Sequence, residues 1–238
     1  MPNPILSDLP TVGERRYLSI ARDLARQIDA GDPAPGERLP PERELATRLA
    51  VSRTTVREAV LALELMRYVE IRVGAGVFVL PPGVRELERG DSPLPDESGP
   101  SEILEARRLI EGQTARRAAE RANETELAAI GASVARMREA LRDIPRFDQA
   151  DAEFHSLIAR AGGNGLLEGY VAHLWQMRAS ALWERWYDQT RNIANRRRSI
   201  EDHEAIHRAL VRRSPDAAAT AMRAHIDVLE ERFFALNL

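Results

Sequence analysis

The sequence predicts a mainly α-helical protein: an N-terminal winged helix-turn-helix (three helices plus a β-hairpin), followed by a C-terminal all-α helical bundle. Three observations indicate this. Apolar residues recur at helical spacing over residues 17–66, the spacing changes to strand alternation over 69–79, and Ala-, Leu- and Arg-rich helical segments without strand signals fill residues 101–238. A chain of 238 residues has room for two small domains.

The first three helices follow from apolar spacing and from their end signals. Gly31 ends the first helix, Leu45 and Leu49 share one face of the second, and Ser52 is a good N-cap for a third helix over residues 53–66. The apolar face of the first helix is formed by Leu18, Ala21, Leu24, Ala25 and Ile28. The third helix buries Val56, Val60 and Leu63.

The stretch "YVEIRVGAGVFVL" predicts the hairpin. Apolar and polar side chains alternate over residues 69–73, Gly74 and Gly76 reverse the chain, and residues 77–79 return. A Pro-, Gly- and acid-rich stretch then separates this part from the helical remainder. We therefore expect an N-terminal arm (1–16), a winged helix-turn-helix (17–80), a linker (81–100) and an all-helical domain (101–238).

The composition excludes several classes of protein and site. The absence of cysteine excludes disulfides and thiolate metal sites. A net charge of −3 means that any nucleic-acid binding depends on a local patch. No apolar run approaches the roughly 18 residues of a membrane span, and the N-terminus lacks the features of a signal peptide. We expect a bacterial-type cytoplasmic protein with no membrane association.

The start of the third helix carries the features of a DNA-reading helix. If its apolar stripe faces inward, Arg53, Thr54, Thr55 and Arg57 face outward, where arginines suit guanine edges and hydroxyls suit phosphates. Gly74 allows the hairpin backbone to approach DNA. The alternative is an ordinary solvated helix face, since residues 1–80 contain eleven arginines and eleven acidic residues. The β-hairpin that follows the third helix favours the interpretation as a DNA-reading helix over that of a solvated face.

The stretch "GDPAPGERLPPERELATRLAVSRTTVREAVLALE", followed by "GAGVFV", resembles the DNA-binding domain of the GntR family of bacterial regulators. The family motif is matched nearly throughout about seventy residues. One departure is Arg67, which stands where the family usually has glycine before the wing. The resemblance implies that the DNA contacts are made by Arg43, Ser52, Arg53, Thr54, Thr55, Arg57 and Gly74.

The helical part carries a candidate metal site. Asp151 and His155 are four residues apart and share one helix face, and later helices offer His203, His207 and His225. A carboxylate and three imidazoles that converge would hold a divalent ion such as Zn, Ni or Mn. Spacing alone leaves open that these are separate surface or capping residues, and that His207 takes the place of His203.

Residues 101–238 are similar to the FCD effector domain of the FadR subgroup of the GntR family. The opening pattern E-x-R-x-x-I-E is present at Glu105–Glu111, and D-x-x-x-H at Asp151–His155. The resemblance implies that Asp151, His155, His203 and His225 are the metal ligands. It also implies a small carboxylate effector, for which Arg107, Arg178 and Asn164 are the candidate binding residues. Both arginines could equally be ordinary surface residues.

The aromatic segment "HLWQMRASALWERWYDQT" resembles the branch of the family that represses hexuronate catabolism, which implies glucuronate, galacturonate or fructuronate as effector. We therefore expect a homodimeric repressor that binds a palindromic double-stranded DNA operator and is released by a sugar acid. The alternatives are a metal-dependent hydrolase fused to a DNA-binding module, a regulator of a different organic acid, and a DNA binder without an effector.

Overall fold

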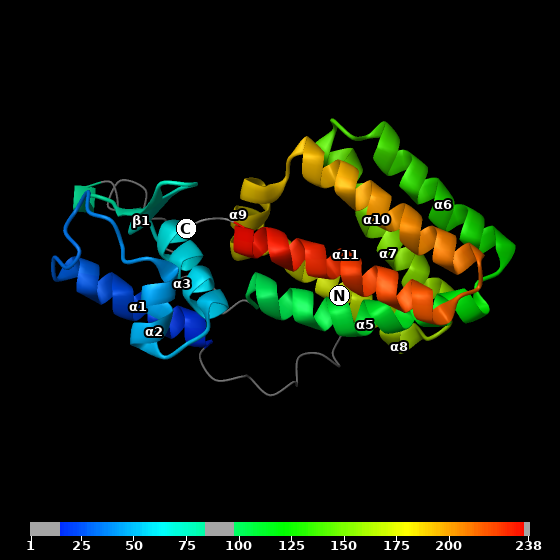
Figure 1. Ribbon diagram of the computed structural model, residues 1–238, viewed down its shortest axis with the longest axis horizontal. Coiled ribbons are helices and arrows are strands. Elements are labelled where there is room, and N and C mark those ends of the chain that lie inside the picture. The colour runs from blue at the N-terminus through cyan, green and yellow to red at the C-terminus, as the bar shows by residue number, and fades with distance from the viewer. Residues whose placement is uncertain (1–14, 84–97, 236–238) are drawn as a thin grey trace, which may run out of the picture. The chain divides into compact units, whose positions relative to one another are not determined.

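The computed structural model describes residues 15–83 and 98–235. The chain divides into two compact units, the first ending at Ser98 and the second beginning at Gly99. The arm expected at residues 1–16 lies almost entirely outside the described residues, as does most of the linker expected at 81–100. The predicted mainly α-helical fold with one hairpin is confirmed (Figure 1).

Within residues 15–80, the N-terminal unit consists of helices followed by a two-stranded antiparallel sheet (Figure 1). Its elements are α1 (Arg16–Asp29), α2 (Glu42–Leu49), α3 (Arg53–Leu65), β1 (Val69–Arg72) and β2 (Gly76–Val79). The strands pair from Val69 opposite Val79 to Arg72 opposite Gly76. Arg38 forms an isolated bridge with Phe78, so the connector between α1 and α2 adds a contact to the hairpin.

Helix α3 is the centre of this unit, with Val56, Val60 and Leu63 at most 1% exposed as the apolar spacing predicts. Ser52 caps it by accepting a hydrogen bond from the Thr55 backbone N–H at 3.0 Å. After α3 the chain turns through Arg67, whose φ is 61°. That left-handed conformation explains why glycine is the usual residue there, and Arg67 adopts it despite its Cβ.

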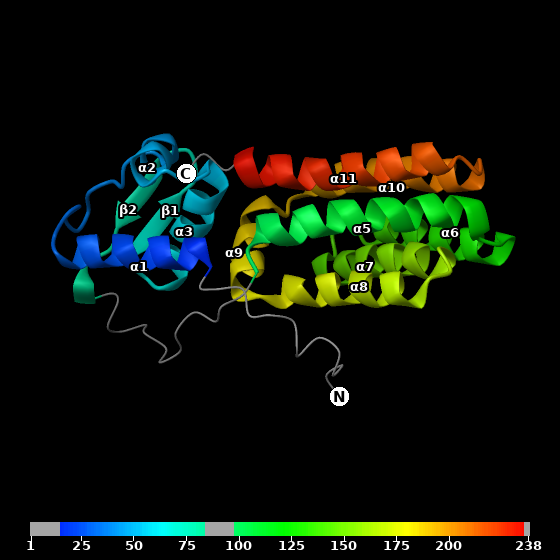
Figure 2. The ribbon, with the colours of Figure 1, turned by 90° about the horizontal axis from the view of Figure 1, so that it is seen from below.

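The C-terminal unit consists of helices throughout its described part (Figures 1 and 2). They are α5 (Pro100–Arg121), α6 (Glu124–Glu139), α7 (Ile144–Ala161), α8 (Gly165–Gln176), the short 3₁₀ helix η1 (Met177–Ala179), α9 (Ala181–Thr190), α10 (Ile193–Val211) and α11 (Pro215–Ala235). Helix α5 packs along α11 and α7, while α10 packs against α11 and α6. This arrangement brings α7, α10 and α11 together around one interior.

Polar residues at the breaks in the sequence start these helices. Asn123 and Glu126 form a reciprocal capping box at the start of α6. The side chains of Asp143, Ser180 and Asn192 cap α7, α9 and α10. None of the helices in the ranges 15–83 and 98–235 is long and apolar enough to cross a membrane.

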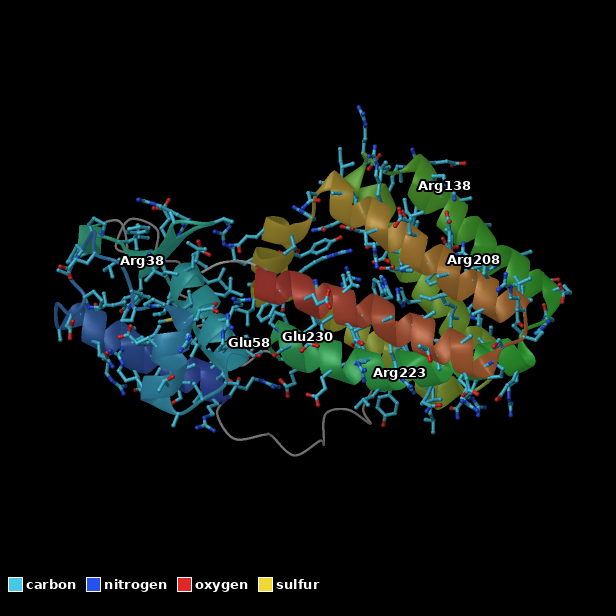
Figure 3. All side chains as sticks on the ribbon, in the orientation of Figure 1. Arg38, Glu58, Arg138, Arg208, Arg223 and Glu230 are labelled. Carbon is cyan, nitrogen blue, oxygen red and sulfur yellow. The ribbon has the colours of Figure 1, made fainter. Side chains whose placement is uncertain are left out.

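The arginine-rich composition is largely a property of the surface. Arg138 on α6 and Arg208 on α10 point outward (Figure 3), and their side chains are 62% and 58% exposed. Among the described residues, three arginines are instead at least nine-tenths buried: Arg57, Arg107 and Arg196. Burying a guanidinium removes it from water at a large cost in free energy, so the partners of these three side chains are informative.

Candidate functional site

The predicted DNA-reading end of α3 is accessible at most of its positions. Arg43, Ser52 and Arg53 are exposed, and Thr54 and Thr55 are half-buried. Ser52 also serves the fold, because its hydroxyl lies 2.7 Å from that of Thr55 in addition to capping α3. At the hairpin turn, Gly74 is exposed with φ +78°, and no atom lies within 4 Å of where its Cβ would be. The wing tip therefore has the open backbone that was expected.

The outward orientation predicted for Arg57 is wrong. Its side chain is 1% exposed and donates to Glu42 twice, from Nε to Oε1 at 2.6 Å and from Nη2 to Oε2 at 2.7 Å. Glu42 is itself buried, and its Oε2 lies 3.6 Å from Nη2 of the exposed Arg53. The apolar spacing of α3 did not reveal this because the acid that draws Arg57 inward belongs to α2. Arg57 holds α2 against α3 and fixes the acid beside Arg53.

Asp151, His155, His203 and His225 converge inside the C-terminal unit. One ligand atom from each lies within 4.8 Å of those of the other three, and all three histidines are buried. The Nε2 atom of His203 lies 3.3 Å from Nε2 of both His155 and His225, and 3.4 Å from Oδ1 of Asp151. Four donors about 2.0–2.1 Å from a shared zinc ion would lie roughly 3.3 Å apart. The cluster therefore has the donor types and spacing to hold a divalent metal.

Each histidine of the cluster has a partner for its second ring nitrogen, as metal-binding imidazoles require. Nδ1 of His155 pairs with buried Glu111, Nδ1 of His225 lies 3.5 Å from Asp202, and Nδ1 of His203 lies 3.2 Å from the sulfur of Met137. Glu111 belongs to the motif that opens the domain, but its role beside His155 was not predicted, because only the packing of α5 on α7 brings the two together.

Electrostatics favour the neutral forms of His203 and His225 and the ionised form of Glu111. Burial lowers the pKa of His203 well below its usual value, and the neighbouring His225 lowers it further. Burial also lowers the pKa of His225, although the hydrogen bond that its ring donates to Asp202 raises it. Burial would raise the pKa of Glu111, but Arg107 and His155 outweigh that effect and hold it well below its ordinary value. Neutral imidazoles are the form that binds metal.

His207 does not join the cluster. Its Nε2 lies 3.0 Å from the backbone oxygen of Leu127 on α6, one helical turn further along α10 than His203. The two histidines are four residues apart on one helix, so their sequence positions alone could not distinguish them. The packing of α6 separates them by giving His207 a backbone partner.

A small cavity that is partly open to solvent adjoins the cluster, lined by side chains of α7, η1, α9, α10 and α11. Asp151 and His225 line it, so a ligand in the cavity would reach the cluster directly. Trp183, Trp186 and Tyr187 of α9 supply an aromatic wall, and both tryptophans are at most 2% exposed. The aromatic segment noted in the sequence is therefore part of the core and lines the cavity as well.

Of the three predicted effector residues, Arg178 lines this cavity and the other two do not. Nη1 of Arg178 lies 3.4 Å from Oδ2 of Asp151, and its guanidinium carbon lies 4.0 Å from the ring centre of Trp175. Arg107 is 1% exposed and donates from Nε to Glu111 at 2.7 Å. Asn164 accepts hydrogen bonds from the backbone N–H groups of Leu166 and Leu167 and caps α8.

Arg107 and Asn164 are therefore both engaged within the fold and are not among the residues that line the cavity, and an effector-binding role for them stays a prediction. The cavity is instead lined by further arginines that the sequence did not single out: Arg191, Arg196 and Arg232. Arg196 stands in the run "NRRRS" beside the exposed Arg197 and Arg198, and nothing in the local pattern distinguishes it from them.

Two models of known protein families match the sequence of this chain. The model described as bacterial regulatory proteins, gntR family, matches residues 16–79, and the FCD domain matches residues 102–228. The chain belongs to the GntR family. It is a DNA-binding transcriptional regulator and not an enzyme, so the hydrolase alternative is rejected.

Relatives of this GntR regulator extend along most of its length. The Uxu operon transcriptional regulator of Escherichia coli K12 is 33% identical, covering 95% of this chain and 90% of the relative. The Exu regulon transcriptional regulator of the same organism is 34% identical, covering 91% and 84%. The solved structure of E. coli McbR/YncC is similar with a TM-score of 0.51, 21% identity and coverage of 92% and 97%, which supports the fold alone.

Proposed function

We propose that the protein is a homodimeric repressor whose helical unit binds a divalent metal and a small sugar acid, and that the sugar acid releases it from a palindromic operator. The convergence of Asp151, His155, His203 and His225 beside an arginine-lined cavity carries this proposal. The metal would be Zn, Ni or Mn, because imidazoles with one carboxylate suit these ions. With four protein donors in place, further coordination positions would accept oxygen atoms of the ligand.

The proposed effector class is a hexuronate such as glucuronate, galacturonate or fructuronate. The supporting observations are the similarity to the Uxu and Exu regulators, the resemblance of the aromatic segment to that branch, and the combination of arginines with aromatic side chains in the cavity. Guanidinium groups pair with carboxylates, while aromatic rings fit the apolar faces of sugars.

DNA recognition is proposed to use the exposed residues at the start of α3 and the wing tip, with Arg43, Arg53 and Gly74 as the principal contacts and Ser52, Thr54 and Thr55 beside them. Arg53→Ala should weaken operator binding by about 1–3 kcal/mol and relax base preference at one position. A gel-shift titration against operator variants measures both. Binding that stays as strong and as selective as in the wild type would remove Arg53 from this role.

Effector binding is proposed to weaken operator affinity by changing the relative positions of the two DNA-binding units in the dimer. A ligand shifts such an equilibrium only by its difference in affinity for the two states. A thermal-shift screen of sugar acids, with and without chelator, followed by operator release for each hit, tests the proposal. We expect hexuronates to raise the melting temperature and release DNA. If only other organic acids do so, the effector class is wrong.

A further inference from the structure

Resting on the proposed function, we propose that Arg196, assisted by Arg232, binds the carboxylate of the effector, while the metal cluster binds a hydroxyl or carbonyl oxygen at the other end of the same molecule. The cavity would therefore have two distinct ligand-binding ends. Arg196 and Arg232 would form one end, and an ion held by Asp151 and His225 would lie at the other; all four residues line the cavity.

The three buried arginines of the described residues differ in their partners. Arg57 is paired with Glu42, and Arg107 is paired with Glu111. Arg196 is 7% exposed, and among the described residues no acid pairs with it and its buried Nε and Nη1 atoms have no hydrogen-bond partner. A buried charged donor without a partner costs more than an ordinary unmade hydrogen bond, so the fold retains Arg196 at the expense of stability.

The surroundings of Arg196 indicate what the missing partner is. The ring centre of Phe147 lies 5.9 Å from the guanidinium carbon, so apolar as well as polar atoms surround the group. Arg232 lines the same cavity and donates to two neutral oxygens, the Ser199 hydroxyl at 3.3 Å and the Asn195 backbone oxygen at 3.2 Å. Two guanidinium groups facing one cavity favour an anion with several acceptor atoms, such as a carboxylate.

The other two arginines of the cavity are less suited to this task. Arg178 is paired with Asp151 and lies over Trp175, and Arg191 is paired with Asp188. A carboxylate at either one would compete with an acid that is already present. At Arg196 it would supply the first acidic partner, so the gain in interaction energy is largest there.

The residues of the two proposed ends line one cavity. Asp151 and His225 of the cluster line the cavity together with Arg196, so one ligand can engage both ends. A hexuronate carries its acid group on one terminal carbon and a carbonyl on or near the other. With the acid at Arg196, a hydroxyl or carbonyl oxygen is left for the ion, which oxygen-binding divalent metals accept.

The experiment compares an acid with its neutral counterpart in protein that contains metal and in protein treated with chelator. Galacturonate and galactose are the probes, and thermal shift and calorimetric titration are the measurements. The full-length wild type is compared with Arg196→Met. Arg197→Met is the matched control, because Arg197 is the next residue of α10 and is exposed. Metal content and circular dichroism are recorded for each protein.

We expect chelator-treated wild type to retain a preference for galacturonate over galactose. Arg196→Met should lower the affinity for galacturonate by roughly tenfold to hundredfold, as expected for charge-assisted hydrogen bonds, without changing its metal content or its response to galactose. Arg197→Met should behave as wild type. His203→Ala provides a metal-deficient protein without chelator, and it too should retain the preference for the acid.

Two outcomes would overturn the proposal and can be told apart. In the first, galacturonate binds the metal-containing protein, removal of the metal abolishes the preference for the acid, and Arg196→Met keeps that preference. The carboxylate then binds the ion, so the proposed function stands and the role proposed for Arg196 fails. If neither form responds to galacturonate or to the other hexuronates, both fail.

Discussion

Arg57 in the N-terminal unit and Arg196 in the C-terminal unit are buried to a similar degree, but their surroundings differ. Arg57 is 1% exposed and donates two short hydrogen bonds to Glu42, while Arg196 is 7% exposed and leaves Nε and Nη1 without partners. The first arrangement is complete within the chain, since each charge has its counter-charge. The second lacks a counter-charge among the described residues, which a bound anion would supply. Burial of an arginine therefore indicates a structural role only when its partner is buried with it.

The metal cluster resembles Arg196 in this respect. Three imidazole nitrogens and a carboxylate oxygen face one another within 4.8 Å, and burial keeps His203 and His225 neutral by lowering their pKa values. Glu111 and Asp202 support His155 and His225 from behind, as the outer partners of metal ligands do. Arg196 and the metal cluster border one cavity. Substitutions in Arg196 and in the cluster should therefore have different consequences from substitutions in the Arg57–Glu42 pair.

The largest effect should come from breaking the complete pair. Arg57→Met leaves Glu42 buried with only the more distant Arg53 for compensation, and should lower the free energy of unfolding of the N-terminal unit by about 3–5 kcal/mol. Urea unfolding of the full chain, followed by circular dichroism, measures this. Arg53→Met is the matched control, since it removes a 59% exposed partner of the same acid and should cost less than about 1 kcal/mol. Equal losses in the two variants would contradict the distinction.

His203→Ala should come next, with the loss of most of the bound metal. His203 is the histidine whose Nε2 lies 3.3 Å from both other imidazoles, so its removal opens the centre of the cluster. Elemental analysis after dialysis measures the metal content. His207→Ala removes an imidazole one turn further along α10 that pairs with a backbone oxygen, and should keep its metal. If His203→Ala retains its metal and His207→Ala loses it, the metal ligand on α10 is His207 and not His203.

Glu111→Gln should have an intermediate effect. The substitution removes the negative charge behind His155 and should weaken metal affinity by roughly 10–100-fold, as loss of an outer partner usually does. Competition with a chromophoric chelator measures the affinity. Glu105→Gln on the exposed face of the same helix is the control and should leave the affinity unchanged. An unchanged affinity in Glu111→Gln would mean that its charge does not act on the cluster.

The smallest effect is expected for Arg196→Met in the absence of ligand. Its free energy of unfolding should change in the opposite direction to that of Arg57→Met. Removing a buried donor that lacks a partner should raise the free energy of unfolding by about 1 kcal/mol, whereas Arg57→Met lowers it. Thermal melting of the C-terminal unit without ligand measures the change, and Arg197→Met should lie within about 0.5 kcal/mol of wild type. A clear loss of stability in Arg196→Met would show that the guanidinium is already satisfied.

Local patterns predicted the helices and the hairpin of the fold, and they placed Asp151 and His155 on one helix face. The spacing of Val56, Val60 and Leu63 marked the buried face of α3, and Ser52 marked its start, because both signals are read within a few residues of chain. The pairing of Asp151 with His155 on one helix face was visible for the same reason. The positions of His203 and His225 came from the family resemblance, and the converging geometry agrees with them.

The roles of the arginines were less accessible to sequence reasoning. Arg57, Arg107 and Arg196 lie in runs that look like solvated helix faces, and whether each is buried depends on a neighbouring helix. Arg57 forms an ion pair with Glu42 of α2, and Arg107 forms one with Glu111. Arg196 lines the cavity, and among the described residues no acid pairs with it. Spacing along the chain reports which residues share a helix face. The charge that a buried side chain meets is set by distant segments, so the partners of these arginines emerged only when the helices were packed together.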